Sequence, residues 1–182
     1  MTFDSSTETS MTDALKTRIR HVPDFPKAGI LFYDVTTLLR DPDGFRIAID
    51  SMTSPFAGAE IDLVVGIESR GFILGSAVAD RLGTGFVPVR KLGKLPAETI
   101  RASYALEYGT DSLEMHRDAV TPGQRVLIVD DLLATGGTAS AAAQLVKELG
   151  GILVGAAFLI ELVGLDGRSK LKGESIHTVL AY

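Results

Sequence analysis

The chain has no cysteine, no long apolar run and no excess of basic residues. Without cysteine it can form neither a disulfide, a thiolate nucleophile nor a cysteine metal site, which fits a cytoplasmic protein. Its 18 Lys and Arg residues against 23 Asp and Glu residues leave a net charge of -5, the wrong sign for a protein that mainly binds a nucleic-acid backbone. The longest apolar run, 152–160, is far too short to span a membrane. These absences predict a cytoplasmic globular protein whose partners include neither nucleic acid nor a membrane.

Enough apolar sequence is present for one core. At 182 residues one domain is expected, and the polar, acidic segment 1–11 predicts a flexible tail ahead of a single domain over 12–182. Apolar periodicity predicts helices over 12–21, 43–52, 71–83 and 138–151, and strands over 61–67, 85–91, 112–116, 125–131 and 152–162. This alternation indicates an α/β fold with a mainly parallel sheet.

The stretch VLIVDDLLATGGT, residues 126–138, places Asp130 and Asp131 at the end of an apolar strand. Gly136 and Gly137 let the backbone approach a ligand, and the free amides of the helix that follows suit an anion. Carboxylates repel a phosphate but suit sugar hydroxyls or a divalent cation. The motif therefore indicates a ribose 5-phosphate site. No lysine follows the glycines as in a P-loop, and a tight turn with one capping aspartate explains only part of the pattern.

This motif is similar to the phosphoribosyl pyrophosphate (PRPP) signature of the type I phosphoribosyltransferases. The stretches DFPKAGILFYDVT (24–36), GIESRGFILG (66–75) and VPVRKLGKLPAETIRASYALEYG (87–109) resemble the adenine phosphoribosyltransferase family. The resemblance runs from about Arg18 to the C-terminus. It implies a mainly parallel twisted sheet flanked by helices, with an N-terminal hood segment and a flexible active-site lid loop. It also implies a cytoplasmic homodimer that transfers 5-phosphoribosyl from PRPP to adenine with Mg²⁺, giving AMP and pyrophosphate in purine salvage.

The resemblance assigns most of the donor site. It implies that Asp130 and Asp131 hold the ribose, and that the loop residues Ala134, Thr135, Gly136, Gly137 and Thr138 hold the 5-phosphate. It implies that pyrophosphate contacts Ser69, Arg70, Arg90, Lys91 and Lys94. An exposed ion pair is the alternative for Arg70, and a solvated loop is the alternative for the three later cations.

The same comparison places Glu68 near the metal and the pyrophosphate. Mg²⁺ is then held mainly through PRPP, with Asp130, Asp131 and Glu68 as candidate ligands. Ser69 does not match a nucleophile elbow, because Ile67 stands where that motif needs glycine. The three histidines show no metal-ligand spacing.

The segment 92–111 is too long for an ordinary connection and predicts a lid loop, which would keep water from an oxocarbenium-like transition state. Within it, Glu107 has the spacing of an exposed surface acid. The resemblance instead matches it to the glutamate proposed as general acid or base at the purine imidazole nitrogens. Tyr108 lies beside it and could close the site.

The base pocket is predicted at Leu31, Phe32 and Tyr33. Phe32 can stack on a purine, and the backbone around its two neighbours can read the purine edge, although Leu31 fits a core strand equally well. Tyr33 stands where relatives commonly carry arginine. Two alternative functions stay open: transfer to hypoxanthine or guanine, and a regulator that senses PRPP without turning it over.

Overall fold

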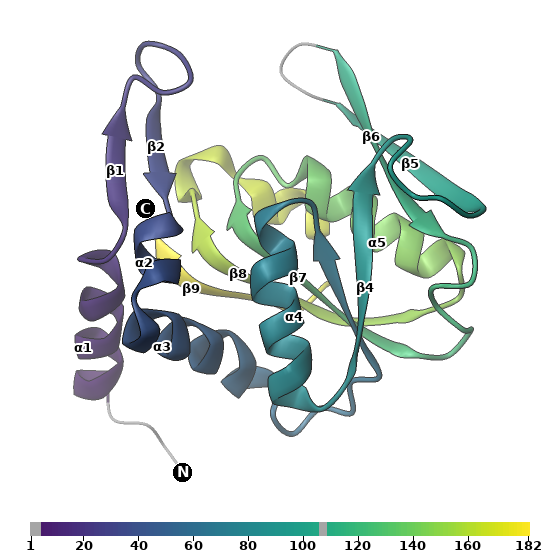
Figure 1. Cartoon of the computed structure of the whole chain (residues 1–182), viewed down its shortest axis with the longest axis horizontal. Coiled ribbons are helices and arrows are strands. Elements are labelled where there is room, and N and C mark those ends of the chain that lie inside the picture. Colours follow the sequence, from purple (N-terminus) through teal and green to yellow (C-terminus); the bar gives the residue numbers. More distant parts are fainter. Residues whose placement is uncertain (1–4, 106–108) are drawn as a thin grey trace. The chain divides into compact units, whose positions relative to one another are not determined.

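The computed structural model describes residues 5–105 and 109–182 (Figure 1). They fall into two compact units, Met1–Ser51 and Met52–Tyr182, a subdivision that the sequence does not predict.

The N-terminal unit contains a β-hairpin between helices. Its elements are α1 (Ser5–Lys16), β1 (Arg20–Pro23), β2 (Leu31–Asp34), α2 (Thr36–Arg40) and all but the end of α3 (Pro42–Thr53). Helix α3 agrees with the predicted helix over 43–52, and Asp41 caps it by accepting hydrogen bonds from the amides of Asp43 (3.0 Å) and Gly44 (3.2 Å). Helix α1 begins at Ser5, within the segment predicted as a tail.

The helix predicted over 12–21 is wrong in its second half. Helix α1 ends at Lys16, and Arg20–Pro23 pairs with β2 as an antiparallel strand. Leu15 and Ile19 are buried as the helical spacing required. Val22, however, lies opposite Phe32 in the hairpin, so this position follows a strand partner and not a helix face.

The C-terminal unit is built on a seven-stranded sheet in the order β5-β6-β4-β3-β7-β8-β9. Its strands are β3 (Leu63–Ile67), β4 (Gly85–Lys91), β5 (Thr99–Ala105), β6 (Thr110–His116), β7 (Arg125–Leu133), β8 (Ile152–Glu161) and β9 (Ile176–Ala181). The pairs from β4 to β9 along the sheet are parallel, and β6 pairs antiparallel with both β4 and β5. The mainly parallel sheet is therefore confirmed. Strand β9, which the sequence does not predict, extends it by pairing with β8.

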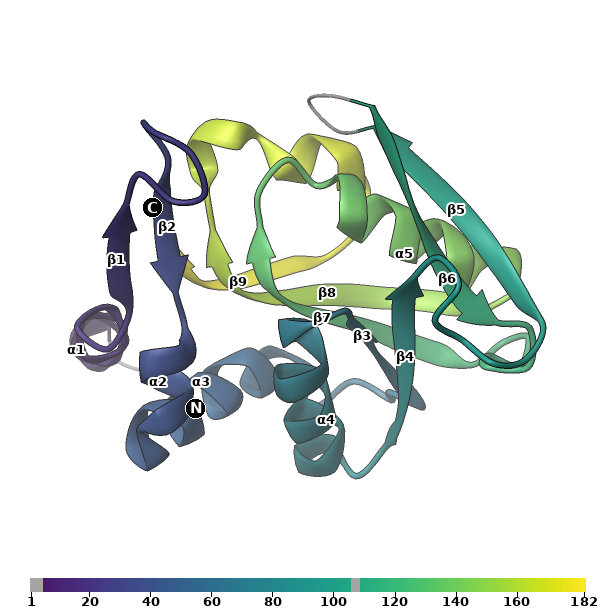
Figure 2. The same cartoon turned by 45° about the horizontal axis from the view of Figure 1, so that its top comes forward.

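Helices α4 (Arg70–Leu82) and α5 (Gly137–Glu148) cover opposite faces of this sheet (Figure 2). Short 3-10 segments complete the unit: η1 (Ser54–Phe56), η2 (Val163–Leu165) and η3 (Gly167–Leu171). Helix α4 ends at Leu82, and the next residue, Gly83, has a left-handed φ of 69°, as glycines that terminate helices commonly do. The β3–α4–β4 and β7–α5–β8 connections run in opposite directions from the centre of the sheet. Such a reversal opens a crevice at the carboxyl ends of β3 and β7, where α/β proteins bind ligands.

The segment predicted as a lid loop, 92–111, is not a continuous loop. Thr99–Ala105 forms β5, which pairs with β6 along its whole length. Ile100 and Ala102 are buried at alternating positions, the pattern of a strand with one covered face. Glu107 and Tyr108 lie outside the described residues.

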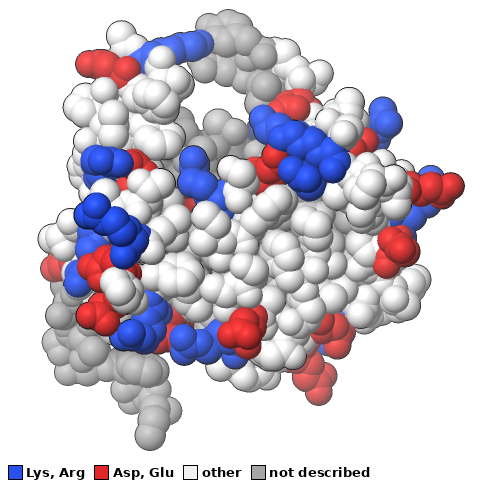
Figure 3. Space-filling view, viewed as in Figure 1, with Lys and Arg blue, Asp and Glu red and all other residues white. Residues whose placement is uncertain are grey.

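The surface carries both signs of charge. In the view of Figure 3, Lys and Arg side chains are interspersed with Asp and Glu side chains. Among the described residues, no helix is long and apolar enough to cross a membrane.

Candidate active site

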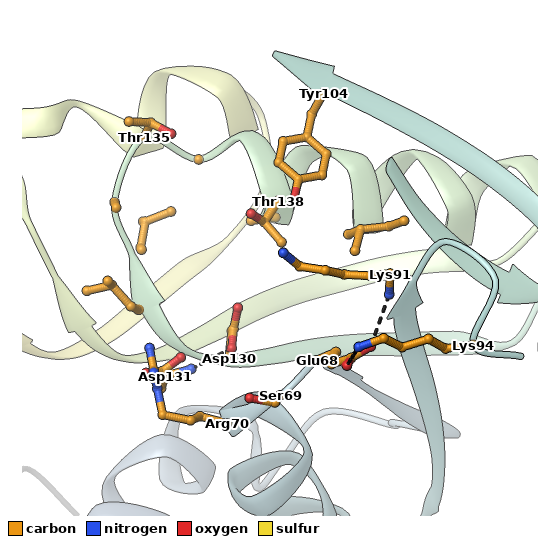
Figure 4. Close-up of a pocket in the computed structure, with 16 residues that line it drawn as sticks. Glu68, Ser69, Arg70, Lys91, Lys94, Tyr104, Asp130, Asp131, Thr135 and Thr138 are labelled. Carbon is orange, nitrogen blue, oxygen red and sulfur yellow. Dashed lines mark hydrogen bonds and ion pairs between the residues drawn. The ribbon is translucent and has the colours of Figure 1, made fainter. Parts of the chain in front are cut away.

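A cavity of about 510 Å³ opens at the carboxyl ends of β3 and β7, within the C-terminal unit (Figure 4). Its lining includes the predicted donor-site residues Glu68, Ser69, Arg70, Lys91, Lys94, Asp130, Asp131, Ala134, Thr135, Gly136 and Thr138. Segments about 60 residues apart in the chain thus meet in one site, as the parallel sheet predicts.

Asp130 and Asp131 lie near the end of β7 and not beyond it, because the strand continues to Leu133 through pairing with β8. Side chains alternate across a strand, so the two carboxylates have different surroundings. Asp131 is buried and forms an ion pair with Nε of Arg70, the first residue of α4. Its amide donates a 2.9 Å hydrogen bond to Oδ1 of Asp130.

Asp130 is half-buried and lines the cavity. Burial and the neighbouring Asp131 carboxylate raise the pKa of Asp130 well above its ordinary value. Gly71 allows this arrangement, because a Cβ there would lie 2.7 Å from Asp130 Oδ1 and 3.0 Å from the carbonyl oxygen of Val129. A carboxylate in these surroundings gains from hydroxyl donors such as those of a ribose.

The loop from Ala134 to Thr138 runs from the end of β7 into the first turn of α5. Gly136 has a φ of 75°, which favours glycine, and precedes the first residue of α5. Helix starts leave several backbone N–H groups without helical partners, and these suit a phosphate. Gly137 is not among the cavity-lining residues; it lies under Tyr104, whose Cδ2 atom would be 3.0 Å from a Cβ at this position.

Glu68 binds the basic residues at the end of β4 and just after it. It accepts hydrogen bonds from Lys94 Nζ, from the Lys91 amide (3.1 Å) and from Arg90 Nε (3.3 Å). Burial raises the pKa of Glu68, but these donors outweigh it and hold the pKa below its ordinary value. Arg90 does not line the cavity; its guanidinium lies 5.9 Å from the centre of the Phe72 ring.

A second carboxylate, that of Asp111, forms an ion pair with the side chain of Lys91. Its Oδ2 lies 3.2 Å from Lys91 Nζ and accepts a 3.1 Å hydrogen bond from the Tyr104 hydroxyl. The hydrogen bond to Asp111 raises the pKa of Lys91 above its ordinary value. Tyr104 lines the cavity beside Thr138 (Figure 4). It lies on β5, within the segment for which the sequence predicts a loop, so the sequence does not identify it.

The predicted base-binding residues lie on β2 in the N-terminal unit. The Phe32 ring packs edge-on against Phe25 with the ring centres 5.1 Å apart, and Tyr33 packs in the same way against His21. Leu31 is 43% exposed, so it does not belong to a core strand. Exposed apolar groups on a hairpin are available to a flat aromatic ligand.

The described residues include no group of three or more side chains able to form a metal cage. Glu68 and Asp131 are both paired with cations, and Asp130 lines the same cavity. This arrangement fits Mg²⁺, which commonly binds through one or two carboxylates, substrate phosphates and water.

Comparisons with known proteins agree with this geometry. A family model described as the phosphoribosyl transferase domain matches residues 43–179. The chain is 61% identical over 168 residues to an adenine phosphoribosyltransferase from Solibacter usitatus, covering 92% of this chain and 97% of that protein.

Solved structures of adenine phosphoribosyltransferases are also similar to this chain. The crystal structure of adenine phosphoribosyltransferase from Rhodothermus marinus superposes with a TM-score of 0.92 at 56% identity, covering 96% of this chain and 99% of that one. The Saccharomyces cerevisiae enzyme, solved with adenine and an imino-altritol bisphosphate, gives a TM-score of 0.89 at 44% identity, covering 94% and 99%. With a type I phosphoribosyltransferase fold, a matching domain and near full-length relatives, this chain belongs to the adenine phosphoribosyltransferase family.

Proposed function

We propose that this chain transfers the 5-phosphoribosyl group of PRPP to adenine, giving AMP and pyrophosphate in purine salvage. The observation that carries the proposal is one cavity lined by two chemically distinct sets of residues. Asp130 and the loop from Ala134 to Thr138 suit a ribose 5-phosphate, and Arg70, Lys91 and Lys94 suit a pyrophosphate.

The donor binds with its 5-phosphate at the start of α5 and its ribose hydroxyls donating hydrogen bonds to Asp130. Asp131 acts mainly through Arg70, whose guanidinium it orients toward the pyrophosphate. Ser69 adds a hydroxyl on the same side. Lys91 and Lys94, paired with Asp111 and Glu68, exchange these single carboxylates for the more highly charged pyrophosphate.

Mg²⁺ is held mainly by PRPP itself, with Asp130 as the protein carboxylate best placed to join it and Glu68 and Asp131 near by. When bound, the cation neutralises charge on the departing pyrophosphate.

Adenine binds at the hairpin residues Leu31, Phe32 and Tyr33, with the Phe32 ring against the purine face and backbone groups reading its edge. In the reaction, the bond from ribose C1 to the pyrophosphate oxygen breaks and its electron pair leaves with pyrophosphate. The imidazole nitrogen of adenine forms the new bond to C1, and its proton passes to Glu107. Tyr108 covers the site and limits attack by water.

We also propose that the protein works as a cytoplasmic homodimer, in which one of the basic residues Arg90, Lys91 and Lys94 contributes to the partner's site. The absence of cysteine fits this compartment. The mass of the particle in solution, measured by light scattering at several concentrations, tests the dimer.

Product analysis tests the proposed reaction. The chain is incubated with adenine, PRPP and Mg²⁺, and the nucleotides are separated by anion exchange. We expect AMP and pyrophosphate in a ratio of one to one. Tight binding of PRPP without either product would instead make the chain a PRPP sensor.

A further inference from the structure

The phosphate loop rests on a segment far from it in sequence. Gly167, the first residue of η3, lies against the loop so closely that a Cβ on Gly136 would be 2.3 Å from the Gly167 carbonyl oxygen. A Cβ on Gly167 would in turn be 2.3 Å from the carbonyl oxygen of Ala134 and 3.1 Å from the amide nitrogen of Gly136. Figure 2 shows this yellow turn beside the connection from β7 to α5. The two backbones can touch only because both positions are glycine.

An ion pair next to Gly167 fixes the turn to the sheet. Arg168 Nε and Nη2 each donate a 2.7 Å hydrogen bond to one carboxylate oxygen of Glu161, the bidentate geometry that binds most strongly. Arg168 Nη2 also donates to Thr178 Oγ1 at 3.0 Å, and Arg168 Nη1 to the Ile176 carbonyl at 3.2 Å.

Glu161 links the Arg168 ion pair to the strand that leads into the phosphate loop. Its side chain is 8% exposed, and in the sheet its backbone pairs with Leu133, the last residue of β7 before the phosphate loop. Thr178 donates a further 2.9 Å hydrogen bond to Glu161 Oε2. The hydrogen bonds from Arg168 lower the pKa of Glu161, so the carboxylate stays ionised at neutral pH. Neither Glu161 nor Arg168 lines the cavity.

We propose that Glu161 and Arg168 are positioning residues that clamp η3 against the phosphate loop and thereby set the affinity for the 5-phosphate of the donor. The inference rests on the proposed function, because it takes the loop from Ala134 to Thr138 as the 5-phosphate site. The clamp holds the Gly136 backbone in its left-handed turn, so that the amides at the start of α5 meet the phosphate without rearranging.

The test compares two ligands that, in the proposed binding mode, contact different residues of the cavity. In Arg168→Ala and Glu161→Gln, we expect the affinity for ribose 5-phosphate to fall about tenfold, since small displacements of binding groups have effects of this size. The affinity for pyrophosphate, which uses Arg70 and Lys91, should stay within twofold. In steady-state assays the KM for PRPP should rise by the same factor while kcat changes little. Arg168→Lys, which keeps the charge but loses the bidentate geometry, should fall between wild type and Arg168→Ala.

Lys147→Ala is the matched control. It removes the ion pair between Lys147 and Glu174, which joins α5 to the segment after η3 but does not touch the clamp, and should change neither affinity. Equal losses for both ligands, or no loss for ribose 5-phosphate, would overturn the inference. If Arg168→Ala fails to fold, Glu161→Gln and Arg168→Lys decide by the same comparison.

The two proposals fail in different ways. Wild-type chain that binds ribose 5-phosphate but makes no AMP contradicts the proposed reaction, and the binding comparison still decides the clamp. Wild-type chain that does not bind ribose 5-phosphate at all contradicts both.

Discussion

Two adjacent aspartates in the site have different surroundings. Asp131 is buried and paired with Arg70, whereas Asp130 is half-buried, faces the cavity and has a raised pKa. The sequence treats them as one pair that holds the sugar. The structure favours a division of labour in which Asp130 meets the ribose and Asp131 orients a cation for the pyrophosphate.

Asp131→Asn tests this division. The change leaves the Arg70 guanidinium without its charged partner, so we expect the Kd for PRPP to rise about tenfold. The loss should also appear with pyrophosphate alone, measured by calorimetry. Asp43→Asn, which breaks an exposed ion pair with Arg46 on α3, is the control and should leave both affinities unchanged. A loss of affinity seen only with ribose 5-phosphate would mean that Asp131 binds the ribose and does not orient Arg70 for the pyrophosphate.

Glu107→Gln should show the opposite pattern. If Glu107 accepts the purine proton, its amide cannot, and kcat should fall about 100-fold while the Kd for PRPP stays within threefold. Rapid-quench kinetics under single-turnover conditions separate the chemical step from product release. An unchanged single-turnover rate would make Glu107 an ordinary surface acid.

At the scale of elements, glycines set how closely α4 approaches the carboxyl end of the sheet. Gly71 in the first turn of α4 lies against Asp130 and the backbone of Val129, and the backbone cannot move aside easily. The sequence predicts the helix from its apolar spacing, but this contact depends on where the helix packs.

Gly71→Ala should therefore lower both the stability of the fold and the affinity of the site for PRPP. We expect the free energy of unfolding to fall by about 1–3 kcal/mol, the usual cost of overpacking, with weaker binding of PRPP. Urea denaturation measures the first quantity and calorimetry the second. Gly58→Ala is the matched control, because a Cβ there meets nothing within 4 Å. Equal behaviour of the two variants would refute the packing argument.

The second strand of the hairpin in the N-terminal unit, β2, ends at Asp34, whose side chain accepts hydrogen bonds. Asp34 accepts a hydrogen bond from the Thr36 amide (2.9 Å) and pairs with Arg20, and its pKa is lowered to about 2, first through the side chain of Thr36. Because the folded pKa is depressed, the stability that Asp34 contributes is present above pH 4 and is lost as the pH falls toward 2.

Asp34→Asn should remove this pH dependence. The difference in free energy of unfolding between wild type and variant should shrink by about 1 kcal/mol from pH 6 to pH 3, as the unfolded-state carboxylate becomes protonated. Urea denaturation at both pH values gives this difference. A constant difference would mean that Asp34 has the same pKa in the folded and unfolded chains.

At the scale of the whole molecule, the chain is acidic, and the basic side chains around the cavity form ion pairs with its carboxylates. Arg70, Lys91 and Lys94 are each paired with Asp131, Asp111 or Glu68 around the cavity. A polyanionic donor can replace these partners, so the net charge of -5 does not prevent its binding.

The fold and most of the residues that line the cavity could be predicted because their signals are local. Alternating apolar segments indicated the parallel sheet, and the stretch 126–138 contains both the carboxylates and the glycine-rich loop that line the cavity. Tyr104 and the clamp between Glu161 and Arg168 were not predicted. Tyr104 packs against Gly137, and Gly167 beside Arg168 packs against Gly136, so both features depend on contacts between distant segments. None of Tyr104, Glu161 and Arg168 stands in a distinctive sequence pattern.

The most direct measurement of the central claim is kcat/KM for pyrophosphate release with PRPP, Mg²⁺ and each of adenine, hypoxanthine, guanine, xanthine and uracil. The account predicts that adenine exceeds every other base by at least about 100-fold, because a site that reads hydrogen-bonding groups rejects bases that leave them unpaired. Turnover only with an oxopurine would contradict the account.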